Sequence, residues 1–380
     1  MIYLTFGDQP SGVYQSQVLD VCKYINQNHS GKIKLIAFFS LRGFFKTRAL
    51  IKKNLPNAIV LPAFPGIRRW KYNLFTLRIV LFFIGSNNFW CRGIFATQLA
   101  LKLRQKGICK SVVFDARGAY SAEHQEYLSQ LINIRENYRA LEKDCVLNAD
   151  YRLAVSEALT HWWKQEFGYT GREHCVIPCN LGASHQNDFP AEKEIMKWRE
   201  KAAYSSADVV LVYSGSNADW QSIAQVDAWL LKLMDKDPSV KLLLLANQSP
   251  EHLTVFKKYP SRVAQNWVPA EKVRTYLLMA DYGILLREQT ITNRVASPTK
   301  YAEYLSAGLQ VLISNNLGDF SDFTGKHHCG IVIDESEIPQ ALPPVNYLRK
   351  RENHELALRH FTRENHAEAY AKILGILSAS

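Results

Sequence analysis

The sequence predicts an α/β protein built from two doubly wound parallel sheets, and three observations lead to this expectation. Short apolar runs alternate with helical patterns along both halves of the chain, which is typical of βαβ units with helices on both faces of a parallel sheet. At 380 residues, the chain is longer than one hydrophobic core usually supports. A polar segment at residues 180–190, with Gly182 and Pro190, interrupts the alternation and is the expected hinge.

The first half carries the pattern of an N-terminal domain over residues 1–182. Its apolar runs predict strands at residues 2–6, 34–39, 58–61, 111–115, 151–155 and 175–177. The intervening periodic stretches predict helices at residues 15–26, 95–106, 122–147 and 157–167. The sequence therefore predicts a Rossmann-like domain in this half.

The second half repeats the pattern and predicts a C-terminal domain over residues 191–360. We expect helices at residues 191–203, 221–234 and 270–279, and strands at residues 209–213, 241–245, 282–286 and 311–313. In such sheets, ligands bind outside the carboxyl ends of the strands. Two domains of this kind are expected to face a central cleft.

The stretch from Ser297 to Gly308 is the most informative motif. Pro298 suits the first position of a helix, where unpaired amides and a partial positive charge favour phosphate. Lys300 adds a full charge in the first turn, and Glu303 lies one turn further on nearly the same face, where a carboxylate suits a ribose diol. The motif therefore suggests a nucleotide site. The alternative is an ordinary capped helix with a solvated glutamate.

Nine stretches, in this order along the chain, carry a resemblance that covers most of it. They are residues 113–118 (VFDARG), 149–158 (ADYRLAVSEA), 176–180 (VIPCN), 212–216 (VYSGS), 281–287 (DYGILLR), 293–300 (NRVASPTK), 303–308 (EYLSAG), 311–314 (VLIS) and 361–365 (FTREN). The chain resembles the family-4 glycosyltransferases, which are retaining enzymes of the GT-B fold. The last stretch resembles the start of the closing helix, so residues 361–380 are expected to pack back on the N-terminal domain.

The resemblance implies a hexosyltransferase-type activity. The substrate would be a nucleotide-diphosphate sugar, and the acceptor would be a bacterial surface polysaccharide or a lipid-linked glycan. Family members are thought to work without an enzyme nucleophile, with the leaving phosphate taking the acceptor proton. The protein would then contribute positioning and charge stabilisation.

Donor binding needs cations and amides for the two phosphates. By resemblance, the backbone of residues 297–300 with Arg294 or Lys300 would hold the pyrophosphate, and Glu303 the ribose. The complete expected donor set is Gly12, Ser214, Gly215, Arg287, Arg294, Ser297, Pro298, Thr299, Lys300 and Glu303. The alternatives are that Arg294 is an ordinary exposed loop residue and that Gly12 is only a turn residue.

The expected catalytic residues are Arg117, His124 and Glu288. Arg117 and His124 follow a strand end and could orient the acceptor, or else only support their neighbours. Many family members carry two glutamates seven residues apart, and the first of these positions is Val295 here. Glu288 could replace it, or backbone amides could contact the sugar. The missing glutamate also raises an alternative function, a non-catalytic sugar-nucleotide-binding scaffold.

Cofactors, metals and compartment are constrained by what the sequence contains. The seven cysteines are scattered and odd in number, which favours a reducing cytosol over a disulfide framework. The sequence has no Gly-x-Gly-x-x-Gly, so we expect no dinucleotide cofactor. We also expect no metal site, because arginines, Lys300 and helix amides can neutralise the phosphates.

Positive charge is concentrated in the first half, where residues 1–180 hold 24 Lys/Arg against 12 Asp/Glu. No acidic residue occurs between Asp20 and Asp115, an interval that contains 17 Lys/Arg interleaved with aromatics. This pattern favours an anionic membrane surface. The expected element is residues 40–53 with residues 68–72, and its expected inserting side chains are Phe44, Phe45, Ile51 and Trp70.

The alternative is a basic soluble face with those aromatics in the core. No sequence window is long enough to span a bilayer, since residues 74–85, the most apolar, are interrupted by Arg78. We therefore expect a cytoplasmic protein that is peripheral on the inner face of the cell membrane. Nucleic acid is not an expected partner, because the basic pI of about 9.2 is unaccompanied by any recognised binding motif.

Overall fold

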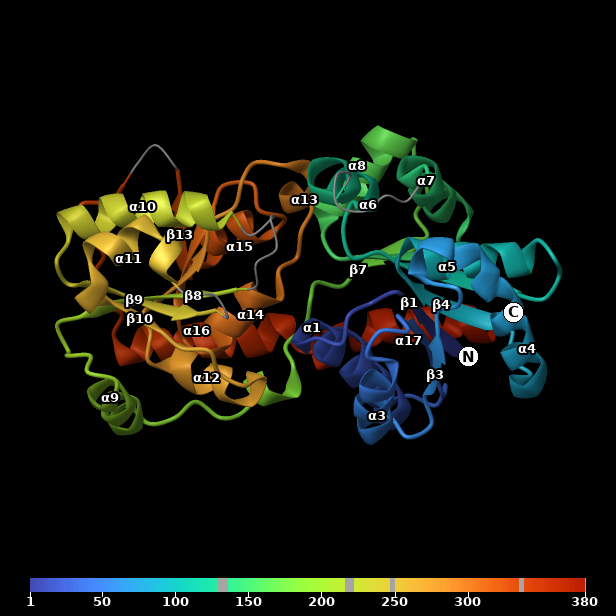
Figure 1. The fold of residues 1–380 in the computed structure, drawn as a ribbon, viewed down its shortest axis with the longest axis horizontal. Coiled ribbons are helices and arrows are strands. Elements are labelled where there is room, and N and C mark those ends of the chain that lie inside the picture. Colours follow the sequence, from blue (N-terminus) through green and yellow to red (C-terminus); the bar gives the residue numbers. More distant parts are fainter. Residues whose placement is uncertain (129–135, 216–221, 247–249, 335–337, 380) are drawn as a thin grey trace. The chain divides into compact units, whose positions relative to one another are not determined.

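The structure is a computed structural model, and it describes residues 1–128, 136–215, 222–246, 250–334 and 338–379. The chain forms two compact units, one of Met1–Gly182 with Arg363–Ser380 and the other of Ala183–Thr362. Figure 1 shows the helices and strands of both units, with colours that follow the sequence from blue at the N-terminus to red at the C-terminus.

The N-terminal unit contains a seven-stranded parallel sheet in the order β3-β2-β1-β4-β5-β6-β7. Its strands are β1 (Ile2–Phe6), β2 (Lys34–Phe39), β3 (Ile59–Pro62), β4 (Asn88–Arg92), β5 (Ser111–Asp115), β6 (Tyr151–Ala154) and β7 (His174–Val176). Strand order reverses between β1 and β4, so these two form the switch point at whose carboxyl ends ligands bind in such sheets.

Helices cover both faces of this sheet (Figure 1). The helical elements of this unit are α1 (Gly12–Tyr14), η1 (Gln15–Leu19), α2 (Asp20–Asn28), α3 (Phe44–Asn54), η2 (Ile67–Tyr72), α4 (Asn73–Ile84), α5 (Gly93–Arg104), α6 (Tyr120–Glu123), η3 (His124–Leu128), α7 (Tyr138–Asn148), α8 (Glu157–Phe167), η8 (Glu364–His366) and α17 (Ala367–Ser378). The helix expected at residues 122–147 crosses residues 129–135, which lie outside the described part of the chain.

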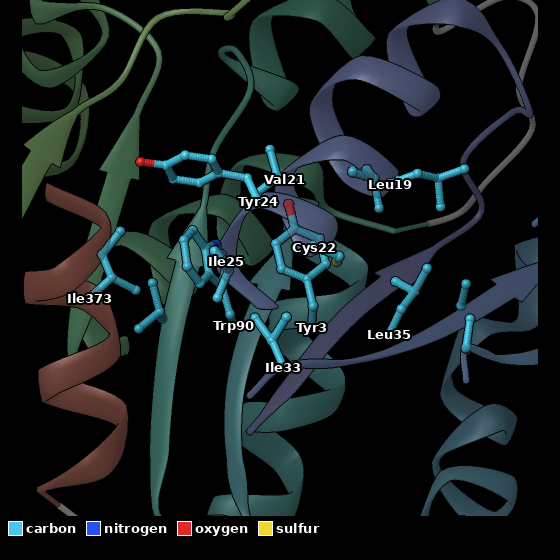
Figure 2. Close-up of a cluster of buried hydrophobic side chains, with 14 of the residues drawn as sticks. Tyr3, Leu19, Val21, Cys22, Tyr24, Ile25, Ile33, Leu35, Trp90 and Ile373 are labelled. Carbon is cyan, nitrogen blue, oxygen red and sulfur yellow. The ribbon is translucent and has the colours of Figure 1, made fainter. Parts of the chain in front are cut away.

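The C-terminal helix α17 packs on the N-terminal sheet. Figure 2 shows Ile373 of α17 beside the strand side chains Tyr3 and Trp90, and all three are fully buried in one hydrophobic cluster. The Asn88 amide also donates a 2.6 Å hydrogen bond to the Leu377 carbonyl. The last residues of the chain therefore complete the core of the first unit.

The C-terminal unit contains a six-stranded parallel sheet in the order β10-β9-β8-β11-β12-β13. Its strands are β8 (Val209–Ser214), β9 (Val240–Leu245), β10 (Val263–Gln265), β11 (Tyr282–Leu285), β12 (Gln310–Ser314) and β13 (Gly330–Ile333). Its helices are η4 (Ala183–His185), α9 (Glu192–Lys201), α10 (Ile223–Lys236), η6 (Pro250–His252), α11 (Thr254–Lys258), η7 (Pro260–Arg262), α12 (Ala270–Leu278), α13 (Ile291–Arg294), α14 (Thr299–Ser306), α15 (Phe320–His327) and α16 (Tyr347–Phe361).

The prediction of two doubly wound, Rossmann-like parallel α/β units is confirmed. The first unit also contains a strand, β4, and two helices, α3 and α4, that we did not predict. In the second unit, the predicted motif from Ser297 to Gly308 forms α14 and the turn before β12.

The expectation for the membrane-inserting side chains is wrong at two of its four residues. Ile51 and Trp70 are fully buried, because Ile51 belongs to the core cluster and Trp70 packs against Phe95. Phe45 is 84% exposed, and Phe44 is partly buried. Within the described residues, no helix is both long and apolar enough to cross a membrane.

Candidate functional site

The beginning of α14 lies beside two basic side chains of the C-terminal unit. Arg287 follows β11, is buried, and is fixed by a 2.7 Å hydrogen bond from its backbone N–H to the Ser314 hydroxyl. Lys300 lies in the first turn of α14 with its ammonium 5.6 Å from the centre of the Tyr213 ring. Burial, followed by the charge of Arg287, lowers the pKa of Lys300 to about 7, and Glu303 opposes this shift. The charge of Arg287 reaches Lys300, so the two basic side chains together favour the binding of an anion beside them.

Pro298 is the N-cap of α14, one residue before the first helical position, where we expected it, and it has no side-chain oxygen with which to cap the helix. The preceding helix, α13, has a side-chain N-cap, since the Thr290 hydroxyl accepts a hydrogen bond from the backbone N–H of Asn293. The segment between the two helices passes close to Gly318, whose φ is +52° and where a Cβ atom would collide with the Ala296 carbonyl. Only a residue without a side chain therefore allows the backbone at Ala296 to approach this closely.

Asn293 is a functional candidate that the sequence did not single out. Its buried side chain accepts a 3.4 Å hydrogen bond from the Arg287 guanidinium and donates one of 3.1 Å to the Glu288 carbonyl. Asn293 thereby orients Arg287. The Glu288 backbone N–H donates to the Ser222 hydroxyl, and the Glu288 side chain is exposed.

Tyr304 is a second residue of this kind. Its hydroxyl accepts a 3.0 Å hydrogen bond from the Ser214 backbone N–H, which connects α14 with the end of β8. Gly283 makes this packing possible, since a Cβ atom there would collide with the Tyr304 ring. The Gly215 backbone N–H donates to the Leu245 carbonyl, so the backbone N–H groups of Ser214 and Gly215 both have protein partners. Ser216, the last residue of the stretch 212–216, lies outside the described residues.

Glu303 lies one turn after Lys300 and is partly exposed. His185, which ends η4, is buried, and it lies close enough to Glu303 for the imidazole and the carboxylate to interact electrostatically. Burial lowers the pKa of His185, while the Glu303 carboxylate opposes that shift. The sequence alone did not suggest His185, because it is more than a hundred residues away from Glu303. Arg294 ends α13 and is exposed, as both interpretations of this residue allow.

In the N-terminal unit, Arg117 forms a buried network with Asp115. The Asp115 carboxylate lies 2.7 Å from the Arg117 Nε and accepts a 2.6 Å hydrogen bond from the Tyr3 hydroxyl. Although burial disfavours its charge, Asp115 and Tyr3 hold the pKa of Arg117 above its ordinary value. These contacts fit the supporting role that we left open for Arg117.

His124 begins η3 and stacks on Tyr138, with ring centres 4.0 Å apart and an angle of 17° between the planes. Burial lowers the pKa of His124, which favours the neutral imidazole. Gly12 begins α1, where Ser11 caps the Tyr14 amide, and a Cβ atom at Gly12 would meet nothing within 4 Å. Gly12 is exposed, as both interpretations of this residue allow.

No group of three or more metal-binding side chains occurs in the described part of the chain. The sequence does contain one Asp-x-Asp pair, Asp235 and Asp237, at the end of α10. Asp235 accepts hydrogen bonds from Lys258 and Tyr259, and Asp237 accepts two from Ser239. Both carboxylates therefore serve local structure.

The fold is similar to that of several solved glycosyltransferases. HepE from Anabaena in complex with UDP-glucose matches with a TM-score of 0.68 and 11% identity, over 100% of this chain and 99% of that one. The sucrose-phosphate synthase of Thermosynechococcus elongatus matches with a TM-score of 0.72 and 14% identity, over 100% and 99%. WaaG, a glycosyltransferase involved in lipopolysaccharide biosynthesis, matches with a TM-score of 0.63 and 13% identity, over 98% and 94%.

No protein-family model and no curated protein sequence matches the chain. At these identities, the solved structures establish the fold, which is GT-B with two Rossmann-like domains.

Proposed function

We propose that the protein is a retaining family-4 glycosyltransferase. It would move a sugar of the hexose type from a nucleotide-diphosphate sugar to a bacterial surface polysaccharide or a lipid-linked glycan. The observation that carries the proposal is the pair of cations, Arg287 and Lys300, beside the first turn of α14, with the pKa of Lys300 lowered to about 7. The complexes of HepE with UDP and UDP-glucose make a uridine nucleotide the first donor to test.

In this proposal, the pyrophosphate is bound by Lys300, by Arg287 and by the amides that follow Pro298. Burial makes a charged Lys300 costly in the empty protein, and an incoming dianion would remove that cost. Arg294, exposed at the end of α13, adds a further charge, while Glu303 binds the ribose hydroxyls. This assigns each part of the nucleotide to a residue type that suits it.

The transfer step needs no nucleophile from the protein. The bond between the sugar anomeric carbon and the phosphate oxygen breaks, and the acceptor hydroxyl oxygen attacks that carbon from the same face. The acceptor proton passes to the leaving phosphate oxygen, so configuration is retained and the products are a nucleoside diphosphate and a glycoside. Arg287 and Lys300 stabilise the charge that develops on the departing diphosphate.

The N-terminal unit would bind the acceptor, with the neutral His124 accepting or donating a hydrogen bond at its hydroxyls. Arg117 would act through Asp115, which it holds in place. Glu288 is exposed after β11 and would contact the donor sugar. The reaction would need no divalent metal, since the cations at α14 would neutralise the phosphates.

The alternative is a scaffold that binds the sugar nucleotide without turning it over. It is favoured by Val295, which is buried where the family carries its first glutamate. The same donor site serves both functions, so turnover decides between them.

The experiment is a panel of UDP-, GDP- and ADP-sugars, screened first by thermal shift and then by release of the free nucleotide. We expect stabilisation by one nucleotide class, and slow nucleotide release that a glycan or lipid extract accelerates. Lys300→Ala should abolish the stabilisation seen by thermal shift. Lys326→Ala, which changes an exposed lysine on α15, should retain it. Binding without release for every donor would establish the scaffold, and no binding at all would refute both.

A further inference from the structure

One face of α4 is apolar and exposed. Four large hydrophobic side chains lie on it at positions i, i+4, i+7 and i+8, which share one side of a helix. Phe82 is 85% exposed, Phe83 is 80% exposed and Phe75 is 70% exposed, and Ile79 lies between them. Figure 1 shows α4 at the periphery of the N-terminal unit.

The other face of α4 accounts for the position of the helix. Leu77 and Leu81 are buried in the core beneath it. Arg78 is the only charged residue between Asn73 and Ile84, so the helix is hydrophobic on nearly every side. A helix of this composition is normally covered on every side, and a contiguous exposed apolar surface marks an interaction site.

A lysine-lined cavity lies next to this helix. It has a volume of about 830 Å³ and is bounded by Ile84 and Ser86 at the end of α4. Three of its lining residues are Lys32, Lys34 and Lys52, and none of the residues that line it in the described structure is acidic. Anionic ligands therefore suit the cavity.

The contacts of these lysines leave the cavity positively charged. The Lys32 ammonium donates to the Asn26 carbonyl at 2.6 Å, and that of Lys52 donates to the Pro56 carbonyl at 2.8 Å. Both acceptors are neutral, so these bonds hold the side chains in place without cancelling their charge. An apolar face beside a cationic hollow matches the acyl boundary and the phosphates of an anionic bilayer.

We propose that α4 docks the protein on anionic phospholipid. Phe75, Ile79, Phe82 and Phe83 would enter the boundary between headgroups and acyl chains, and the cavity lysines would bind lipid phosphates. This inference deepens the proposed function by naming the surface through which a lipid-linked acceptor would be approached. It differs from the sequence-based expectation, which assigned insertion to residues 40–53 and 68–72.

The test is sedimentation of the purified full chain with vesicles of phosphatidylcholine, either alone or with 30% phosphatidylglycerol. At low salt we expect binding to the anionic vesicles only. Phe82→Ser with Phe83→Ser should weaken binding at least tenfold, since burying one phenylalanine is worth roughly a factor of ten or more. Replacing Lys32, Lys34 and Lys52 with Ser should weaken binding by about fivefold per lysine.

Leu348→Ser is the matched control. Leu348 is 69% exposed, about as much as Phe75, but it lies on α16 in the other unit. Its loss should leave vesicle binding unchanged, and each variant should keep the wild-type melting temperature and nucleotide affinity. Retained nucleotide binding separates a failure of this inference from a failure of the proposed donor site.

Three results would overturn the inference. They are wild-type protein that ignores anionic vesicles at low salt, loss of binding in Leu348→Ser equal to that in the α4 variant, and a dimer in solution that the α4 variant converts to a monomer. The last result would assign the apolar face to a second copy of the chain.

Discussion

Replacing Lys300 with Met should stabilise the empty protein and weaken donor binding. Burial and the neighbouring Arg287 lower the pKa of Lys300 from 10.5 to about 7. A lysine with a lowered pKa destabilises the folded state fully below its folded pKa, and this penalty decreases as the pH rises toward the unfolded value of 10.5. Methionine keeps the length of the side chain and removes the charge, so the penalty disappears.

The size of the pKa shift of Lys300 sets how much unfolding free energy the Lys300→Met substitution should add. With each pKa unit worth about 1.4 kcal/mol, the lysine costs about 5 kcal/mol at pH 6 and about 2 kcal/mol at pH 9. Part of the Lys300 side chain still reaches solvent, so both figures are upper bounds. The difference in unfolding free energy between Lys300→Met and wild type should therefore decrease as the pH rises from 6 to 9.

Donor binding should also depend on pH through Lys300. A bound pyrophosphate should raise the pKa of Lys300 again, so binding takes up a proton above pH 7. The affinity of the wild type for the donor should then decrease by up to tenfold per pH unit above pH 7, and Lys300→Met should lose this dependence together with a ten- to hundredfold share of affinity.

Urea denaturation at pH 6 and pH 9 measures the first effect, and calorimetry with UDP-glucose over the same range measures the second. Lys326→Met is the control, because Lys326 is exposed on α15 and should change neither quantity. If Lys300→Met destabilises the protein and binds the nucleotide as the wild type does, the lysine is a structural residue and our reasoning about α14 fails.

Three further predictions concern the same unit. Glu303→Ala should weaken nucleotide affinity by roughly ten- to a hundredfold while leaving the melting temperature unchanged, and equal affinity by calorimetry would contradict its ribose role. Turnover should continue in excess chelator, and full loss that manganese or magnesium restores would show that the phosphates need a metal. Gly283→Ala should lower the unfolding free energy by about 1–3 kcal/mol, because the new methyl group collides with the Tyr304 ring, and an unchanged denaturation midpoint would contradict that packing.

Much of the fold could be predicted from the sequence because parallel strands are buried on both faces and form short, nearly continuous apolar runs. The runs at β1, β2 and β5 have this character. The strand β4 was missed because Asn88 begins it and Arg92 ends it, with only three apolar residues between. Its place beside β1 depends on pairing across more than eighty residues, which no local pattern reveals.

In the candidate site too, features set by residues close in sequence could be predicted, and features that depend on distant contacts could not. The helix α14 and its basic neighbours could be predicted because Pro298, Lys300 and Glu303 are close in sequence and their spacing has a direct physical meaning. His185 and Tyr304 could not, since each acts through a partner that only the folded chain brings near. Asn293 lies in the stretch 293–300 that carries the resemblance, but its role depends on the two hydrogen bonds by which it connects Arg287 with the Glu288 carbonyl.

Burial explains why Val295 has no charged side chain. Val295 is 3% exposed and closes α13, so a glutamate at this position would need a partner or would have to leave its pocket. Glu288 and Arg294 precede Val295 in the chain and are exposed, so their side chains could take up the role of that glutamate. If the protein transfers a sugar, that sugar must therefore be recognised by groups outside position 295, and its identity depends on those groups.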